Sequence, residues 1–195
     1  MQQKIIIRKI RNSDALRLKE FLLGLGQEVF DLWNRFGYSL NANQAKKIAA
    51  KQCNLPPSKE IGLIALRQRA EICGYAYLRF FPEKKTKEHI ATLGVVVSPQ
   101  YQNMGIGKEL ILKLHDWAKR NGIKKIWLGT YMRNKQALHL YQGIGYQVEG
   151  IFMYDESGRH GWDHIVSMAF MFDKKFKDVK HQRQLLWGKL ERGRI

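Results

Sequence analysis

The stretch Val95-Val96-Val97-Ser98-Pro99-Gln100-Tyr101-Gln102-Asn103-Met104-Gly105-Ile106-Gly107-Lys108 runs from an apolar strand pattern, through a glycine-containing turn, into a helix pattern. Glycines in such a turn let backbone amides approach a ligand closely. The first turn of a helix adds unpaired N–H groups and partial positive charge. The pattern is typical of a site for a diphosphate. The alternative is that Gly105 and Gly107 only shape the turn between strand and helix.

Two familiar phosphate-binding patterns do not fit this stretch. A Walker loop would need glycine at position 102 and serine or threonine at position 109, where the chain has Gln102 and Glu109. The dinucleotide fingerprint would need a third glycine at position 110, which is Leu110. Neither a P-loop nucleotide nor a dinucleotide is therefore indicated.

The apolar patterns on either side of the stretch predict a sheet covered by helices. Strands are expected at 4–11, 60–66, 72–81, 89–97, 125–128, 146–154 and 162–172, and helices at 15–23 (capped within 12–14), 43–52, 105–121 and 134–141, while 27–41 stays ambiguous. A helix crossover interrupts a series of hairpins. This order predicts an α/β fold whose mixed, mostly antiparallel sheet of about seven strands is flanked by about four helices.

Length and composition indicate one globular domain of ordinary size. The chain has 195 residues, of which 45% are hydrophobic and 26% charged, enough for a core without disulfides. A disordered chain, a collagen-like chain and a disulfide miniprotein are excluded. Cys53 and Cys73 form no CxxC pair and are interpreted as buried hydrophobic side chains. With a short N-terminal apolar run, we expect a cytoplasmic protein without signal peptide or membrane span.

Charge is the unusual feature of the composition. There are 34 Lys+Arg against 17 Asp+Glu, so the formal net charge is +17. Such an excess attracts nucleic acid, an anionic membrane surface or a phosphorylated ligand. Residues 174–195 form a basic tail of net charge +6, from Lys174, Lys175, Lys177, Lys180, Arg183, Lys189, Arg192 and Arg194 against Asp178 and Glu191.

A second segment, together with the first, makes the indication of function more specific. Residues Asn134-Lys135-Gln136-Ala137-Leu138-His139-Leu140-Tyr141-Gln142-Gly143-Ile144-Gly145-Tyr146 have the form N-x-x-A-x-x-L-Y-x-x-x-G-F/Y, and residues 102–107 have the form Q/R-x-x-G-x-G. The two segments together resemble the GNAT superfamily of N-acetyltransferases. The resemblance covers about residues 4–173. It implies an acetyltransferase domain over 1–173, followed by the basic tail over 174–195.

For the turn, the resemblance implies an acetyl-CoA site. Backbone amides of the turn would hold the CoA pyrophosphate, and the edge of the preceding strand would pair with the pantetheine arm. The implied cofactor-binding residues are Val95, Val97, Gln102, Asn103, Met104, Gly105, Ile106, Gly107, Lys108 and Asn134. Lys108 could instead be a solvated lysine, and Asn134 could also be a plain helix cap. The membrane is thereby no longer an expected partner.

The resemblance also implies the chemistry. Tyr141 stands where the family has a general acid, which protonates the departing CoA thiolate after a primary amine attacks the acetyl thioester in a ternary complex. No metal is implied, and the histidines match no metal-ligand spacing; His139 is interpreted as a surface residue. The general base stays open, because Thr92 stands where many relatives carry Glu. Candidates are Glu88, His89, Glu149, Asp163, His164 and a water relay.

The acceptor amine is the largest unknown, and it could belong to a small molecule or a peptide. Candidate acceptor-site residues, which could equally be core or solvated side chains, are Phe30, Trp33, Phe36, Tyr38, Asp155, Glu156 and Asp163. The alternatives are an acyltransferase on a protein or ribosome-associated target, with the tail docking on RNA, and a non-catalytic CoA- or RNA-binding protein. A homodimer is also open, since the tail could form an amphipathic helix through Phe176, Val179, Leu186 and Leu190.

Overall fold

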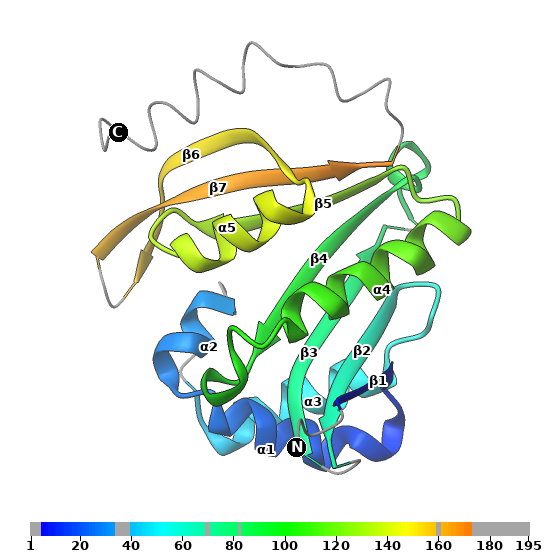
Figure 1. The fold of residues 1–195 in the computed structure, drawn as a ribbon, viewed down its shortest axis with the longest axis vertical. Coiled ribbons are helices and arrows are strands. Elements are labelled where there is room, and N and C mark those ends of the chain that lie inside the picture. Colours follow the sequence, from blue (N-terminus) through cyan, green and yellow to red (C-terminus); the bar gives the residue numbers. More distant parts are fainter. Residues whose placement is uncertain (1–4, 34–39, 69–70, 82, 159–160, 173–195) are drawn as a thin grey trace.

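The computed structural model describes residues 5–33, 40–68, 71–81, 83–158 and 161–172 (Figure 1). The predicted tail, Phe36 and Tyr38 lie outside the described residues. The strands are β1 (Ile5–Lys9), β2 (Glu60–Arg67), β3 (Glu71–Phe80), β4 (Ile90–Val97), β5 (Lys125–Tyr131), β6 (Gln147–Gly158) and β7 (Gly161–Met171). The α-helices within these ranges are α1 (Ala15–Gly24), α2 (Gln27–Trp33), α3 (Ala42–Asn54), α4 (Ile106–Arg120) and α5 (Lys135–Ile144).

The seven strands form one sheet in the order β1-β2-β3-β4-β5-β7-β6. All neighbours pair antiparallel except β4 and β5, which α4 joins by a parallel crossover. The predicted α/β fold with a mostly antiparallel sheet of seven strands is therefore confirmed. The described part of the chain has five α-helices where about four were expected, because α2 occupies part of the region left ambiguous at 27–41.

The parallel pair β4 and β5 separates after a short contact (Figure 1). Only residues 90–92 of β4 pair with residues 125–127 of β5, although β4 continues to Val97 and β5 to Tyr131. The two strands therefore diverge beyond Thr92 and Trp127. Along this opening, backbone groups on the facing edges of both strands lack a neighbouring strand within the described part of the chain, which leaves room for an extended ligand.

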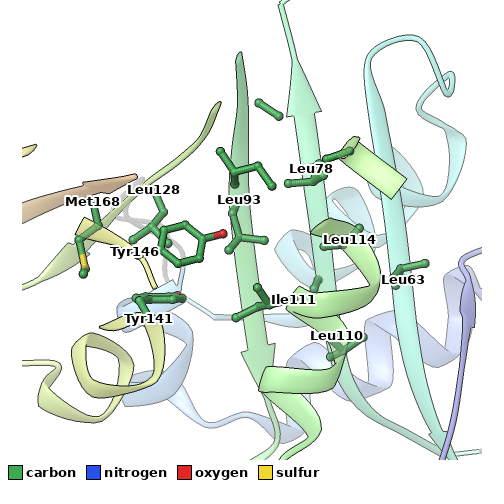
Figure 2. Close-up of a cluster of buried hydrophobic side chains, with 14 of the residues drawn as sticks. Leu63, Leu78, Leu93, Leu110, Ile111, Leu114, Leu128, Tyr141, Tyr146 and Met168 are labelled. Carbon is green, nitrogen blue, oxygen red and sulfur yellow. The ribbon is translucent and has the colours of Figure 1, made fainter. Parts of the chain in front are cut away.

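Side chains alternate across the sheet and divide the interior into two cores. One core lies between the sheet and α4 and α5, and Figure 2 shows Ile111 and Leu114 of α4 above Leu78 and Leu93 of the strands. The other core packs the opposite face against α1, α2 and α3, with Leu18, Phe30, Ala49, Ile64, Tyr75 and Val96 among its members. Because both faces are covered, β2 and β3 are apolar almost throughout, as the sequence pattern indicated.

Helix α4 lies close to β3 because residue 74 has no side chain. A Cβ atom at Gly74 would lie 3.1 Å from Leu110 Cδ1 and 3.2 Å from Ile106 Cγ2. The first turn of α4 is thus held against the sheet, with Ile106 buried. This contact fixes where the helix begins, and so where its N-terminal amides point.

The expected cap of the first helix is wrong in one detail. Asp14 precedes α1, but its side chain makes no capping bond to that helix. Its carboxylate instead accepts hydrogen bonds from Arg8 Nη1 at 2.7 Å and Nη2 at 2.8 Å, and from the Arg11 amide at 2.8 Å. Asp14 is almost fully buried, and the charge-assisted hydrogen bonds from Arg8 lower the pKa of its carboxyl group.

His115 on α4 makes the structure sensitive to mild acid. It is buried, its Nε2 lies 2.8 Å from the Tyr146 hydroxyl oxygen, and its ring packs 4.3 Å from the ring of Phe170. Burial lowers the pKa of His115 to about 4. Between that value and the ordinary pKa of about 6.5, only the unfolded chain takes up the proton. The stabilisation is therefore complete above pH 6.5 and is lost as the pH falls towards 4.

We expect the free energy of unfolding to drop by about 2 kcal/mol between pH 7.5 and pH 5 through this one group. Urea unfolding at both pH values checks it, with His115→Gln as the reference. The variant is expected to be less stable at pH 7.5 but to lose less stability on acidification. Equal losses in the two proteins would show that His115 is not the titrating group.

Candidate active site

The opening between β4 and β5 is the inner part of a cavity of about 1150 Å³. Its walls come from β3, β4, the turn before α4, β5, α5 and α2. One end lies at the turn that precedes α4, and the other lies under α2. The segments 95–108 and 134–141, which are distant in the sequence, therefore face one space.

The turn at the first end is held in an open shape by its own side chains. Gln102 Nε2 donates to the Val97 carbonyl at 3.2 Å, and Gln136 Nε2 of α5 donates to Asn103 Oδ1 at 2.9 Å. Asn103 has φ 61° and Gly105 has φ 80°, both in the left-handed region. A Cβ atom at Gly105 would meet no described atom within 4 Å, so space remains above the turn.

Backbone amides at the start of α4 give this end its electrostatic character. The first bond of the helix is from the Glu109 amide to the Gly105 carbonyl, so the amides of Ile106, Gly107 and Lys108 have no acceptor within the helix. Gly105 caps the helix without a side-chain acceptor. Three converging N–H groups, the helix dipole and the exposed Lys108 favour an anion, and they fit a diphosphate.

A second set of contacts anchors the turn to the sheet. The Tyr101 hydroxyl accepts a hydrogen bond from Arg67 Nη1 at 2.6 Å and donates to Glu71 at 3.0 Å. Tyr101 is buried under the turn and also borders the cavity. These bonds tie the turn to the hairpin between β2 and β3, which keeps the amide array in place.

Tyr141 reaches the cavity from α5. Asn134 Oδ1 accepts from the Ala137 amide at 3.2 Å, so Asn134 is the N-cap of this helix and also lines the cavity. Tyr141 is buried, and its ring centroid lies 5.6 Å from that of Tyr146 (Figure 2). Burial raises the pKa of Tyr141 well above its usual value of about 10, so the phenol keeps its proton at neutral pH.

Both segments that face this cavity fall within a match to a known protein family. The model of the acetyltransferase (GNAT) family matches residues 27–146, which include both the turn and the Tyr141 segment. The chain belongs to this family. The resemblance noted from the two motifs is thereby confirmed.

Individual relatives of this GNAT protein act on different amines. Thialysine N-epsilon-acetyltransferase of Mus musculus is 30% identical over 106 residues, covering 54% of this chain and 55% of that protein. The ribosomal protein bS18-alanine N-acetyltransferase of Escherichia coli is 28% identical over 81 residues, covering 42% and 51%. The chain spans about half the length of the curated relatives it matches, or less.

A solved structure shows the same fold. The Salmonella typhimurium acetyltransferase yncA, described with its cofactor acetyl-CoA, superposes with a TM-score of 0.69 at 20% identity, over 88% of this chain and 95% of that one. At this identity the likeness shows the GNAT fold alone.

The cavity brings together nearly all residues expected at the cofactor site. Lining residues include Val95, Val97, Gln102, Asn103, Gly105, Ile106, Gly107, Lys108, Asn134 and Tyr141. Met104 is the exception among them, because its side chain is 63% exposed and does not line the cavity. Only the backbone amide of Met104 can therefore contribute to the site. This role, like the other roles assigned to these residues, stays a prediction.

The candidate bases lie elsewhere. Glu149 pairs with Lys125 at 2.5 Å, Asp163 pairs with Arg133, and His164 Nδ1 accepts from the Tyr154 amide at 3.0 Å. None of these lines the cavity, and neither do Glu88 and His89. Thr92 does line it but has no basic group. Of the carboxylates in the described part of the chain, Glu28 alone borders the cavity.

The acceptor side under α2 contains residues that the sequence did not reveal. Of the candidate acceptor-site residues on α2, Trp33 lines the cavity, while Phe30 is fully buried in the core and does not. Tyr77, Arg79 and Trp127 were missed. One sequence signal could have indicated Arg79, namely that it is a charged residue near the end of the largely apolar strand β3. His139 is exposed, as predicted, and also borders the cavity on the α5 side.

Neither cysteine is suited to act as a nucleophile. Cys53 and Cys73 are buried free thiols, as predicted. Burial raises the pKa of each to about 11, so neither is a thiolate nucleophile at neutral pH. Among the described residues, no group of three or more His, Cys, Asp or Glu side chains is arranged to hold a metal ion. No described helix is long and apolar enough to span a bilayer.

Proposed function

We propose that the protein is an N-acetyltransferase that moves an acetyl group from acetyl-CoA to a primary amine in a ternary complex. The observation that carries the proposal is the continuity of one cavity from the amide-lined turn, along the open edge of β4, to the buried phenol of Tyr141. The named relatives all transfer acyl groups to amines, and the Salmonella protein is described with acetyl-CoA.

Different groups along the cavity bind the cofactor and take part in catalysis. The amides of residues 102–108 bind the pyrophosphate, with Lys108 as an added charge. Val95 offers its backbone to the pantetheine arm, whereas the Val97 carbonyl already accepts from Gln102. Tyr141 donates its proton to the CoA sulfur as the tetrahedral adduct of amine and thioester collapses, and the C–S bond breaks.

Proton removal from the amine occurs through water in this proposal. A lysine-like amine with pKa about 10.4 is mostly protonated at pH 7 and must become neutral before it attacks. Glu28 lies at the solvent-exposed side of the cavity under α2, where it attracts the ammonium and receives the proton through water. No other described carboxylate is placed to do so.

The test is a panel of amines, with release of the CoA thiol as the readout and mass spectrometry of the product. Amino acids, simple amines and a peptide with N-terminal alanine are offered with acetyl-CoA. We expect at least one acceptor to give acceptor-dependent thiol release and an N-acetylated product. Acetyl-CoA binding by calorimetry without turnover of any amine would favour the non-catalytic alternative.

A second candidate acceptor is the N-terminus of a ribosome-associated protein. It is favoured by the bS18-alanine relative and by the net charge of +17, which suits an RNA-rich target. Faster acetylation of the alanine peptide than of the other amines in the panel would favour this acceptor. The cytoplasmic location, a homodimer and RNA docking by residues 174–195 stay predictions.

A further inference from the structure

We propose that Arg79 binds a carboxylate of the acceptor, so that the natural substrate is a free amino acid or a close analogue rather than a peptide N-terminus. The proposal rests on the proposed acetyltransferase function and specifies its acceptor. Arg79 lines the cavity from β3, under α2.

The register of the sheet places Arg79 at the point where β4 and β5 diverge. Arg79 pairs with Thr92 of β4, and Thr92 is the last β4 residue that pairs with Trp127 of β5. The three residues form one row at the point where the strands diverge, and all three line the cavity. Neighbouring strands are about 4.8 Å apart, so the guanidinium lies within a side-chain length of the opening.

A buried carboxylate holds Arg79 in place. Glu60 faces it on β2, and its side chain is 2% exposed. Glu60 Oε2 accepts from Arg79 Nε at 2.9 Å and lies 2.9 Å from Nη2. The Tyr75 hydroxyl donates to Glu60 Oε1 at 3.3 Å, and the Tyr77 ring lies 5.0 Å from the guanidinium carbon. The arginine is therefore orientated by its surroundings before any ligand binds.

The same contacts leave part of the guanidinium available. An arginine has five N–H donors, and the contacts with Glu60 use Nε and Nη2. The Arg79 side chain is 33% exposed, and Arg79 lines the cavity. A planar fork with unused donors matches a carboxylate better than it matches a peptide carbonyl.

Charge on the cavity walls supports a zwitterion. Apart from Lys108 at the turn, Arg79 is the permanent cation among the described lining residues, and Glu28 is the carboxylate. Both lie on the acceptor side, and the apolar Val29, Leu32 and Trp33 of α2 line the same space. A free amino acid offers an ammonium, a carboxylate and a side chain to these three features. A peptide N-terminus lacks the nearby carboxylate.

The experiment compares L-amino acids with their carboxamides, which keep the amine and side chain but lose the negative charge. Values of kcat/KM are divided by the fraction of neutral amine, because the two amines differ in pKa. We expect the wild-type protein to prefer the acid about 10- to 100-fold, the usual range for hydrogen bonds to a charged group. Equal use of acid and amide, or preference for the alanine peptide, would overturn the proposal.

Variants test whether Arg79 causes the preference for the amino acid over its carboxamide. Arg79→Gln alone leaves Glu60 buried and unpaired and could unfold the protein, so Arg79→Gln with Glu60→Gln is measured beside it. In the double variant the acid-to-amide ratio should fall close to one, through a higher KM for the acid. Arg120→Gln, an exposed arginine on α4 that bonds its own helix, is the matched control and should keep the wild-type ratio.

The outcomes separate the two proposals. If amines of any kind are acetylated but the double variant keeps the preference, the assignment of Arg79 is wrong and the acetyltransferase function stands. If no amine is acetylated although acetyl-CoA binds, the function itself fails. Thermal melting of each variant shows whether the comparison is between folded proteins.

Discussion

Replacing Tyr141 by phenylalanine should lower kcat about 10²-fold and leave the affinity for acetyl-CoA nearly unchanged. The phenol is buried in the wall of the cavity, and burial raises its pKa, so it carries a proton throughout the working pH range. A CoA thiolate with pKa about 8.5 can leave without help, so the loss is partial. Steady-state kinetics of thiol release, with calorimetric titration of acetyl-CoA, measure both quantities.

The pH profile gives this prediction a second readout. Activity of the wild-type protein should rise with pH as the acceptor amine loses its proton, with no decline from Tyr141 below about pH 10, because its pKa is raised. Tyr141→Phe should give a lower but parallel curve. Tyr146→Phe, which removes a neighbouring buried hydroxyl that contacts His115, is the control and should keep kcat within a few-fold. Full turnover by Tyr141→Phe at every pH would reject the general-acid role.

Gly105→Ala should weaken acetyl-CoA binding about 10²-fold. The added methyl group would stand in the open space above the amide array and displace the pyrophosphate from about two charge-assisted hydrogen bonds. The left-handed φ of 80° also makes alanine unfavourable there, at a cost of about 1–2 kcal/mol in stability.

Gly122→Ala separates these two effects. Gly122 follows the other end of α4, has φ 76°, and a Cβ atom there would also meet no described atom within 4 Å. It should lose similar stability and keep the wild-type affinity. Calorimetry and thermal melting of both variants make the comparison. If the two variants lose acetyl-CoA affinity equally, the turn before α4 is not the pyrophosphate site.

The parts of the site that could be predicted are local in the sequence. The turn of residues 102–107 and the segment 134–146 each carry their geometry in a few adjacent residues, through glycines, a helix start and a cap. The mixed, mostly antiparallel character of the sheet followed from short connections and one crossover helix, whereas the position of β7 between β5 and β6 was not predicted. The region of helix α2 stayed ambiguous because the helix is short and has one buried residue, Phe30, which gives little helical periodicity.

The acceptor side could not be predicted because it depends on contacts between distant residues. Glu60 and Arg79 meet only through the register of β2 and β3, and Glu28 joins them by the packing of α2. Two candidate bases suggested by residue type, Glu149 and Asp163, form ion pairs with Lys125 and Arg133. No local sequence pattern reveals these pairs. Residue type alone indicated which side chains could act as bases or bind the acceptor, and tertiary packing determined which of them face the cavity.

The most direct test of direct transfer is whether acetyl-CoA is cleaved only when an acceptor is present. The protein is mixed with acetyl-CoA alone and then with the best amine of the panel, and thiol release is followed together with the intact mass of the protein. Direct transfer predicts negligible release and an unchanged protein mass without amine, and steady release with an N-acetylated product once the amine is added. Rapid release without acceptor, together with an acetylated protein, would contradict it.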